Sequence, residues 1–184
     1  MHSPNEDVEE ILLSSEQIAG RLDTLAGELR RDYADQDLTL VAVLTGSVMF
    51  IADLLKRLPI PVRLDYIGVS SYRGLRSSPD DFTLTKALQL DVRGHDVLVV
   101  DDILDTGRTL VRIREMIGKL QPRSLRSCVL LEKDVPHDAR FQADYVGFHV
   151  PDKFVVGYGL DYRERFRNLP YIATLKPEVL ATLR

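Results

Sequence analysis

The fold of this chain is decided by the stretch Val97-Leu98-Val99-Val100-Asp101-Asp102-Ile103-Leu104-Asp105-Thr106-Gly107-Arg108-Thr109-Leu110. It opens with four apolar residues, three of them β-branched, after the breaker Gly94-His95-Asp96, and this pattern predicts a fully buried strand of a parallel sheet. Beyond the polar loop, apolar residues return at helical spacing, at Leu110, Ile113, Ile117 and Leu120. A buried strand that passes through a short loop into a helix is typical of α/β proteins.

Two adjacent carboxylates, Asp101 and Asp102, end the predicted strand. Two neighbouring negative charges are costly unless a cation or a hydroxyl-rich group lies against them. Carboxylate oxygens are also the ligands that hard divalent cations prefer. The pair therefore predicts a site for a divalent metal or a sugar diol.

The loop Asp105-Thr106-Gly107-Arg108-Thr109 leads directly into the predicted helix. Gly107 allows successive backbone N–H groups to approach an anion, and the positive N-terminal end of the helix favours negative charge. Alone, the loop also fits an ordinary strand-to-helix turn with a threonine cap. Next to the acidic pair it favours a phosphate site, although neither G-x-x-x-x-G-K-[ST] nor G-x-G-x-x-G occurs in the chain.

The composition is that of a globular protein. The chain has 184 residues, 45% hydrophobic and 28% charged, which predicts one domain with a sizeable core. Its net charge of -4 argues against a nucleic-acid partner. The single cysteine, Cys128, lies in an apolar run and is expected in the core, so no disulfide framework is available. The acidic N-terminus does not resemble a signal peptide and no apolar run reaches membrane-spanning length, so we expect a cytoplasmic location and no membrane partner.

Further elements follow the same α/β pattern. Ser14-Ser15-Glu16-Gln17 fits a capping box ahead of an amphipathic helix. A second helix, with Phe50, Leu54 and Leu55 inward, follows Thr45-Gly46-Ser47, a second candidate anion loop that a plain turn would also explain. Strands are predicted over Leu38–Leu44, Val62–Val69, Thr83–Leu90, Leu125–Leu131, Asp144–Phe148 and Phe154–Tyr158. The long polar segment from Ser70 to Asp81 is either a disordered loop or a functional lid.

The acidic pair and the loop after it resemble the phosphoribosyl-pyrophosphate signature of the type I phosphoribosyltransferases. The whole chain, including the run from Pro151 to Tyr162, is similar to the hypoxanthine-guanine branch of that family. The resemblance implies an α/β fold, with a mainly parallel twisted sheet flanked by helices and a small C-terminal hood. Residues 1–184 would form a single domain, with a core over about residues 35–150 and a hood made by the C-terminal segment with part of the N-terminus.

The resemblance also implies roles for the ribose, phosphate and pyrophosphate residues. Asp101 and Asp102 would engage the ribose hydroxyls, directly or through magnesium. Asp105 would act as general base on the purine ring nitrogen. The 5-phosphate would lie on Thr106, Gly107, Arg108 and Thr109, the pyrophosphate on Thr45, Gly46 and Arg167, and the lid would close from Ser71 and Tyr72. Many relatives carry a basic residue in place of Thr45, and the loop around Gly46 often contains a non-proline cis peptide bond.

The purine would be held by residues of the last third of the chain. Lys133 would donate to the exocyclic oxygen of a 6-oxopurine, Phe154 would stack on the base, Val155 would offer backbone hydrogen bonds, and Asp161 would lie at the purine and hold Mg²⁺. The metal would also be bound through Asp101 and Asp102. Taken singly, these residues have simpler explanations as a solvated lysine, a core aromatic, a core aliphatic and a turn aspartate, and Arg167 as a solvated arginine.

The implied activity is purine salvage. The enzyme would transfer the 5-phosphoribosyl group from phosphoribosyl pyrophosphate to N9 of hypoxanthine and guanine, giving IMP or GMP and pyrophosphate, and would act as a homodimer or homotetramer. One alternative is a non-catalytic regulator of the same fold that senses phosphoribosyl pyrophosphate or a nucleotide; the presence of Asp105, Lys133 and Phe154 argues against it. Another is a phosphoacceptor signalling domain at Asp101 or Asp102, which the mid-chain position of the pair disfavours.

Overall fold

The computed structural model describes residues 4–71, 82–138 and 141–182. Its core is a six-stranded sheet of order β4-β3-β2-β5-β6-β7. All neighbouring strands are parallel except β4, which runs antiparallel to β3 at one edge. The six strands are β2 (Leu38–Leu44), β3 (Val62–Ser71), β4 (Phe82–Lys86), β5 (Asp96–Leu104), β6 (Ser124–Lys133) and β7 (Tyr145–Val150).

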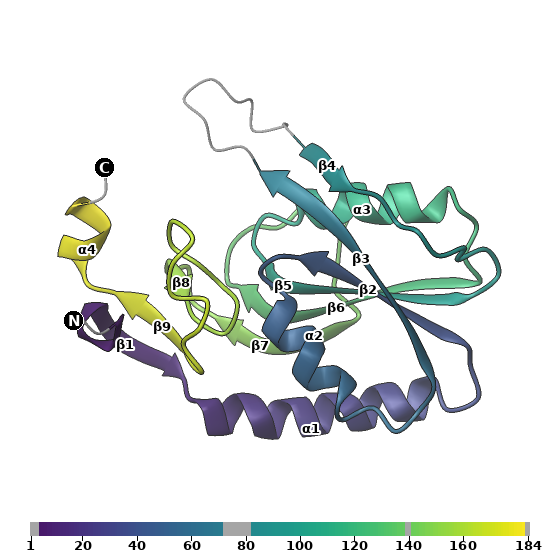
Figure 1. Ribbon diagram of the computed structural model, residues 1–184, viewed down its shortest axis with the longest axis horizontal. Helices are drawn as coiled ribbons and strands as arrows, with labels where there is room; N and C mark the ends of the chain where they lie inside the picture. Colours follow the sequence, from purple (N-terminus) through teal and green to yellow (C-terminus); the bar gives the residue numbers. More distant parts are fainter. Residues whose placement is uncertain (1–3, 72–81, 139–140, 183–184) are drawn as a thin grey trace.

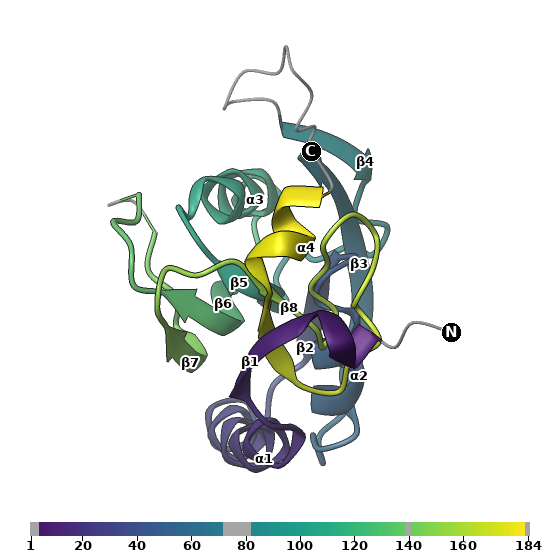
Figure 2. The ribbon, with the colours of Figure 1, turned by 90° about the vertical axis from the view of Figure 1, so that its left-hand side faces the viewer.

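Helices cover both faces of this sheet (Figures 1 and 2). On one face, α1 (Ser15–Asp32) and α2 (Val48–Leu55) share a hydrophobic cluster with Leu40 and Ala42 of β2. On the other face, α3 (Arg108–Gly118) shares a second cluster with Val41 and Val43 of the same strand. Because alternate residues of a strand face opposite ways, a strand covered on both sides is apolar on both faces, and in β2 only the buried Thr39 is polar. The mainly parallel, helix-flanked sheet predicted from the sequence is confirmed.

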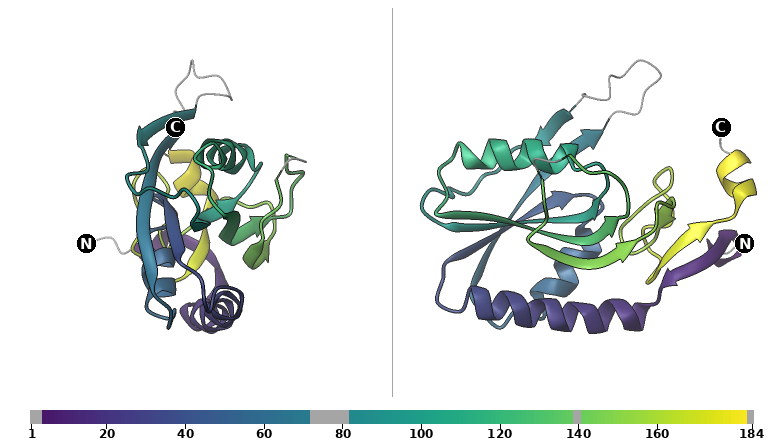
Figure 3. Two further views of the ribbon diagram at one scale, coloured as in Figure 1. Left: turned by 90° about the vertical axis from the view of Figure 1, so that its right-hand side faces the viewer. Right: turned by 180° about the vertical axis from the view of Figure 1, so that it is seen from behind.

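A second, three-stranded antiparallel sheet joins the two ends of the chain. It contains β1 (Val8–Leu13), β9 (Ile172–Leu175) and β8 (Val155–Val156), in the order β1-β9-β8. A short 3-10 helix (Pro4–Asp7) precedes β1, and α4 (Pro177–Thr182) follows β9. We call this sheet, with the loop of residues 157–171, the hood. The parallel strands of the core sheet point their carboxyl ends toward it, as the view from behind also shows (Figures 1 and 3).

Several local predictions are confirmed. Ser14 caps α1 in a full capping box, in which its hydroxyl accepts from the Gln17 N–H and the Gln17 side chain accepts from the Ser14 N–H. Strand β2 has the predicted bounds, Cys128 is buried, and Phe50 and Leu54 are buried while Leu55 is half-buried. Among the described residues, no helix is long and apolar enough to cross a membrane.

Three predicted strands end too early, because β3 continues to Ser71, β6 to Lys133 and β7 to Val150. Four further predicted boundaries are wrong for physical reasons. β5 does not end at the acidic pair, because its pairing with β6 continues through Leu104, which lies opposite Glu132. Leu120 lies outside α3 and is 42% exposed, since the helix ends at Gly118 and the chain then turns away. β4 ends at Lys86 instead of Leu90, because the Asp65 carboxylate takes the N–H groups of Gln89 and Leu90. β8 contains only two residues, because Gly157 and Tyr158 have positive φ angles of 96° and 50°.

The predicted lid lies mainly outside the described residues. Ser71 ends β3, and Tyr72 falls in the segment 72–81, beyond the described part of the chain. The lid therefore stays a prediction.

Candidate active site

The loops that carry the predicted site leave the core sheet at the carboxyl ends of β2, β5 and β6. β5 and β6 run in register up to Leu104 and Glu132, so the next residues, Asp105 and Lys133, emerge side by side. The Lys133 Nζ lies 3.3 Å from the Asp105 Oδ2 and 3.3 Å from the Asp152 Oδ1. Ligand sites of open α/β sheets form at this edge.

The acidic pair lies inside this edge of the sheet. Asp101 is only 7% exposed and Asp102 is half-buried. Each carboxylate accepts a backbone N–H, from Asp102 to Asp101 at 2.9 Å and from Ile103 to Asp102 at 2.9 Å. Burial raises the pKa of Asp101 well above its usual range, and the neighbouring charge of Asp102 raises it further. Burial also raises the pKa of Asp102, against the opposing effects of Asp101, local backbone N–H groups and Arg167.

These two carboxyl groups fit a cation or a diol. A buried acidic pair is held ionised when a positive charge or hydroxyl donors reach it. Mg²⁺ in particular is commonly held by one or two carboxylates together with substrate phosphates. No group of three or more His, Cys, Asp or Glu residues within ranges 4–71, 82–138 and 141–182 is arranged as a metal site by itself.

The loop after β5 has the geometry of an anion-binding turn. Gly107 adopts a left-handed conformation, with φ of 78°, and caps α3 without a side-chain hydrogen bond. Its carbonyl accepts the Val111 N–H at 2.9 Å, which starts the helix. Thr106, Arg108 and Thr109 are exposed around it. The first N–H groups of a helix and the flanking hydroxyls are thus open to a phosphate.

The loop after β2 fits closely between the acidic pair and the hood. The peptide bond between Leu44 and Thr45 is cis. A Cβ on Gly46 would lie 1.6 Å from the Asp102 Oδ2, and a Cβ on Gly159 of the hood would lie 2.0 Å from the Gly46 carbonyl oxygen. Only glycines allow this approach of three segments, so Gly46 has a packing role in addition to its predicted ligand role.

Two of the predicted ligand residues of the hood pair with each other. The Arg167 guanidinium lies 2.9 Å from the Asp161 Oδ1 and 3.0 Å from the Glu164 Oε2, and it donates to the Gly159 carbonyl at 2.8 Å. Asp161 also accepts the Glu164 N–H at 2.9 Å. A metal at Asp161 and a pyrophosphate at Arg167 would therefore compete with these contacts.

The predicted base-binding residues Phe154 and Val155 lie at the start of β8 in the hood. Phe154 is 39% exposed and packs edge-to-face on Tyr162, with ring centroids 5.5 Å apart. The Val155 side chain is buried, so only its backbone can face a ligand. An exposed aromatic ring next to a strand backbone is suited to stacking on a flat heterocycle while the backbone reads its edge.

Two residues near the site were not predicted from the sequence. Asp152 is 65% exposed and shares Lys133 with Asp105. The Nδ1 of His137 faces the Asp105 carbonyl oxygen within hydrogen-bonding distance. Asp152 lies within the run from Pro151 to Tyr162, but its contact with Lys133 is long-range and no pattern predicts it; no motif marks His137, whose contact involves a backbone atom.

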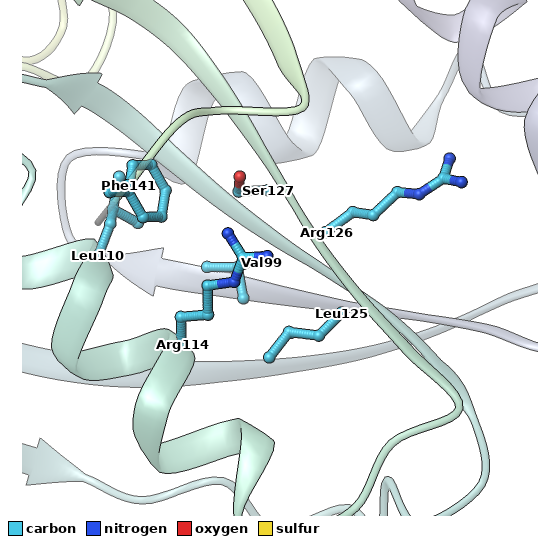
Figure 4. A pocket seen from close by; sticks show the side chains of 7 residues that line it. All are labelled: Val99, Leu110, Arg114, Leu125, Arg126, Ser127 and Phe141. Carbon is cyan, nitrogen blue, oxygen red and sulfur yellow. The ribbon is translucent and has the colours of Figure 1, made fainter. Parts of the chain in front are cut away.

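A small pocket, partly open to the surface, lies away from this edge (Figure 4). It is mostly apolar and lies between β5, β6 and α3, lined by Val99, Leu110, Arg114, Leu125, Arg126, Ser127 and Phe141. None of the predicted ligand residues lines it.

Comparison with known proteins identifies the class. A family model described as the phosphoribosyl transferase domain matches residues 9–163, and the chain belongs to this family. Its curated relatives include the hypoxanthine-guanine phosphoribosyltransferase of Staphylococcus aureus, 44% identical over 173 residues, 94% of this chain and 97% of the relative. The enzyme of the same name from Mycobacterium tuberculosis is 42% identical over 94% of this chain and 89% of its own. A crystal structure of a Staphylococcus aureus hypoxanthine phosphoribosyltransferase matches with a TM-score of 0.91 at 44% identity, covering 97% of this chain and 98% of that one. The family resemblance stated from the sequence is confirmed.

Proposed function

We propose that this chain transfers the 5-phosphoribosyl group of phosphoribosyl pyrophosphate to N9 of hypoxanthine and guanine, releasing pyrophosphate and forming IMP or GMP. The observation that carries the proposal is the pair of Lys133 and Asp105, 3.3 Å apart at the carboxyl ends of two strands. A 6-oxopurine presents O6 and N7 side by side on one edge of the ring. An ammonium group can donate to O6 while the adjacent carboxylate takes the ring proton, so the pair matches that edge.

The remaining predicted residues bind different groups of the second substrate, phosphoribosyl pyrophosphate. Thr106, Gly107, Arg108 and Thr109 receive the 5-phosphate, in line with the exposed helix N-terminus behind them. Thr45, Gly46 and Arg167 receive the pyrophosphate. Ser71 and Tyr72 close over the site to exclude water, which would otherwise attack the oxocarbenium-like ribose.

Asp101 and Asp102 orient the ribose hydroxyls in this scheme. They also take part in holding Mg²⁺, with Asp161 as a further ligand once it leaves Arg167. When bound, Mg²⁺ neutralises charge that develops on the departing pyrophosphate. The protein residues supply binding, orientation and the transfer of one proton to Asp105.

The alternative of a non-catalytic sensor lacks a supporting observation. A sensor of phosphoribosyl pyrophosphate needs the phosphate loop but has no use for a base-reading lysine beside a carboxylate. Lys133 is only 12% exposed, and holding an ammonium group in that position has a desolvation cost. A catalytic and base-selective site explains this arrangement.

For the assembly, we propose a homodimer or homotetramer in the cytoplasm, without nucleic-acid or membrane partners. Support comes from large apolar side chains on the surface of α2 and β3, including Leu64, Tyr66 and Met49, which are 48%, 42% and 39% exposed. Light scattering coupled to size-exclusion chromatography measures this property directly. A purely monomeric protein at assay concentration contradicts it.

The test of the function is a pyrophosphate-release assay with purified protein, Mg²⁺ and phosphoribosyl pyrophosphate. Hypoxanthine and guanine should each support release together with formation of the nucleotide, and reactions without a base should not. A sensor protein would bind phosphoribosyl pyrophosphate in calorimetry without releasing pyrophosphate when hypoxanthine is added. That result overturns the proposal.

A further inference from the structure

The loop that follows β6 is attached to the phosphate loop at two successive residues. The Asp138 N–H donates to the Thr106 carbonyl at 2.9 Å. One residue earlier, the His137 ring places Nδ1 against the Asp105 carbonyl oxygen. A Cβ on Gly107 would lie 3.8 Å from the Asp138 nitrogen, so the two loops are in van der Waals contact there as well. The segment over residues 134–138 thus packs against the phosphate loop through His137 and Asp138.

The hydrogen-bonding role of the His137 ring follows from its partners. A carbonyl oxygen only accepts, so the Nδ1 that faces it carries a proton; a carboxylate oxygen also only accepts, so the ring bridges both partners only when its second nitrogen is protonated as well. The other ring nitrogen, Nε2, lies 3.4 Å from the Glu132 Oε1. The imidazole is 21% exposed and Glu132 is 19% exposed, so this contact is largely shielded from water. The ring therefore connects Glu132, near the end of β6, to the backbone of the loop after β5.

A fixed carbonyl also fixes the peptide group to which it belongs. The peptide unit between Asp105 and Thr106 is planar, and in a trans unit its C=O and N–H point in opposite directions. A hydrogen bond that holds the Asp105 carbonyl toward His137 therefore directs the Thr106 N–H away from His137. It also restricts the backbone that carries the Asp105 side chain.

We propose that His137 is a positioning residue that pre-orders the phosphate loop through the Asp105 carbonyl and that Glu132 holds its ring in place. This inference rests on the proposed function, in which that loop binds the 5-phosphate. Pre-ordering reduces the conformational cost of binding. The consequence is a specific one: phosphoribosyl pyrophosphate binds more tightly.

The experiment replaces His137 by side chains that keep a donor at the position of Nδ1, at the position of Nε2 or at neither. The amide nitrogen of asparagine can take the place of Nδ1, glutamine extends to the place of Nε2, and leucine offers neither. We expect His137→Leu and His137→Gln to weaken phosphoribosyl pyrophosphate binding by ~3–10-fold, the effect of one lost hydrogen bond. His137→Asn should stay within about two-fold of wild type, because it retains the donor that the carbonyl needs.

His149→Gln is the matched control. His149 also faces Glu132, with Nδ1 3.5 Å from its Oε2, but it is 78% exposed and lies on β7. It should leave the binding of both substrates unchanged. The dissociation constant of phosphoribosyl pyrophosphate is measured by calorimetry without purine, and KM for hypoxanthine is measured by pyrophosphate release.

The outcomes distinguish this inference from the function. Weaker phosphoribosyl pyrophosphate binding in the leucine variant, restored by asparagine, supports the positioning role. Equal loss in the asparagine and leucine variants, or no loss in either, overturns it. The proposed function fails separately, if wild type and His149→Gln both bind phosphoribosyl pyrophosphate but release no pyrophosphate with hypoxanthine.

Discussion

The Lys133 Nζ lies 3.3 Å from the Asp105 Oδ2, although Lys133 ends β6 and Asp105 follows β5. The contact is a direct consequence of the parallel register of β5 and β6, which places Leu104 opposite Glu132 and so brings the next residue of each segment together. It joins a donor-only group to an acceptor-only group at the position where a base would approach. A bound 6-oxopurine would insert its O6 and ring nitrogen between partners that already face each other.

Lys133→Met should reduce the efficiency of the enzyme with hypoxanthine while phosphoribosyl pyrophosphate still binds. Methionine keeps most of the side-chain volume and removes the donor to O6. Sites built around such a hydrogen bond can reject the wrong partner by as much as ~10⁴–10⁵-fold, so wild type should not use adenine. Steady-state kcat/KM with hypoxanthine and adenine measures both effects. Lys153→Met, which removes an exposed lysine paired with Glu10, is the control. Comparable use of adenine and hypoxanthine by wild type would show that the base is selected elsewhere.

Asp105→Asn should lower kcat by ~10²–10⁴-fold, the usual contribution of a general base. Binding of phosphoribosyl pyrophosphate should persist, because the backbone of the phosphate loop is unchanged. Asp152→Asn is a matched control, since Asp152 contacts the same ammonium group at the same distance but is 65% exposed. Single-turnover measurements separate the chemical step from product release. Near-normal turnover of Asp105→Asn would remove this residue from the mechanism.

Gly46→Ala should lower both stability and activity. The added methyl group would meet the Asp102 Oδ2 at 1.6 Å, so either the carboxylate or the loop must move. Overpacking of this kind typically costs ~1–3 kcal/mol, and each kcal/mol lowers the Tm of a domain of this size by ~2–4 °C. Gly20→Ala is the control, because nothing lies within 4 Å of the new methyl group in α1. An unchanged Tm for Gly46→Ala would mean that the approach of the loop to Asp102 is looser than described.

Asp65→Asn should destabilise the protein at neutral pH but much less in acid. Burial opposes ionisation of Asp65, yet the N–H groups of Leu90, Gln89 and Tyr66, together with Lys86, hold its pKa below the usual value. A lowered pKa means that the folded protein binds the proton more weakly than the unfolded chain. The carboxylate therefore contributes stability above its ordinary pKa of about 3.9, and this contribution is lost as the pH falls below that value.

The measurement for Asp65 is Tm against pH for wild type and variant. The gap between the two curves should be widest near neutral pH and should narrow below about pH 4. Asp91→Asn is the control, because Asp91 is exposed and directly follows Leu90, and its curve should follow wild type. A gap that stays constant down to the lowest pH would show that packing, and not ionisation, explains the loss.

Strands and helices could be predicted where a single physical rule decided them. Leu38–Leu44 is apolar apart from the buried Thr39 because both faces are covered, and the capping box at Ser14 is a local hydrogen-bond pattern. The ends of elements were less predictable. β4 ends early because Asp65, on the neighbouring strand, accepts the N–H groups of Gln89 and Leu90, and no local pattern encodes such a contact.

In the candidate site, too, residues could be predicted one at a time but contacts between distant segments could not. The motifs identified Asp105 and Lys133 one by one, through a resemblance, but their separation depends on strand register. Asp161 and Arg167 were assigned to different ligands, whereas the structure pairs them at 2.9 Å. His137 acts on a carbonyl oxygen, and backbone atoms leave no mark in the sequence.

The pairing of β1 with β9 has a consequence for how the protein is made. β1 lies at the edge of the hood sheet and its neighbour, β9, comes from the other end of the chain. Synthesis proceeds from the N-terminus at roughly 5–20 residues per second, so the core strands are available to pair while β9 has yet to leave the ribosome. During that interval the backbone groups of β1 that pair with β9 have no strand partner. The nascent protein therefore can complete its core sheet before its hood.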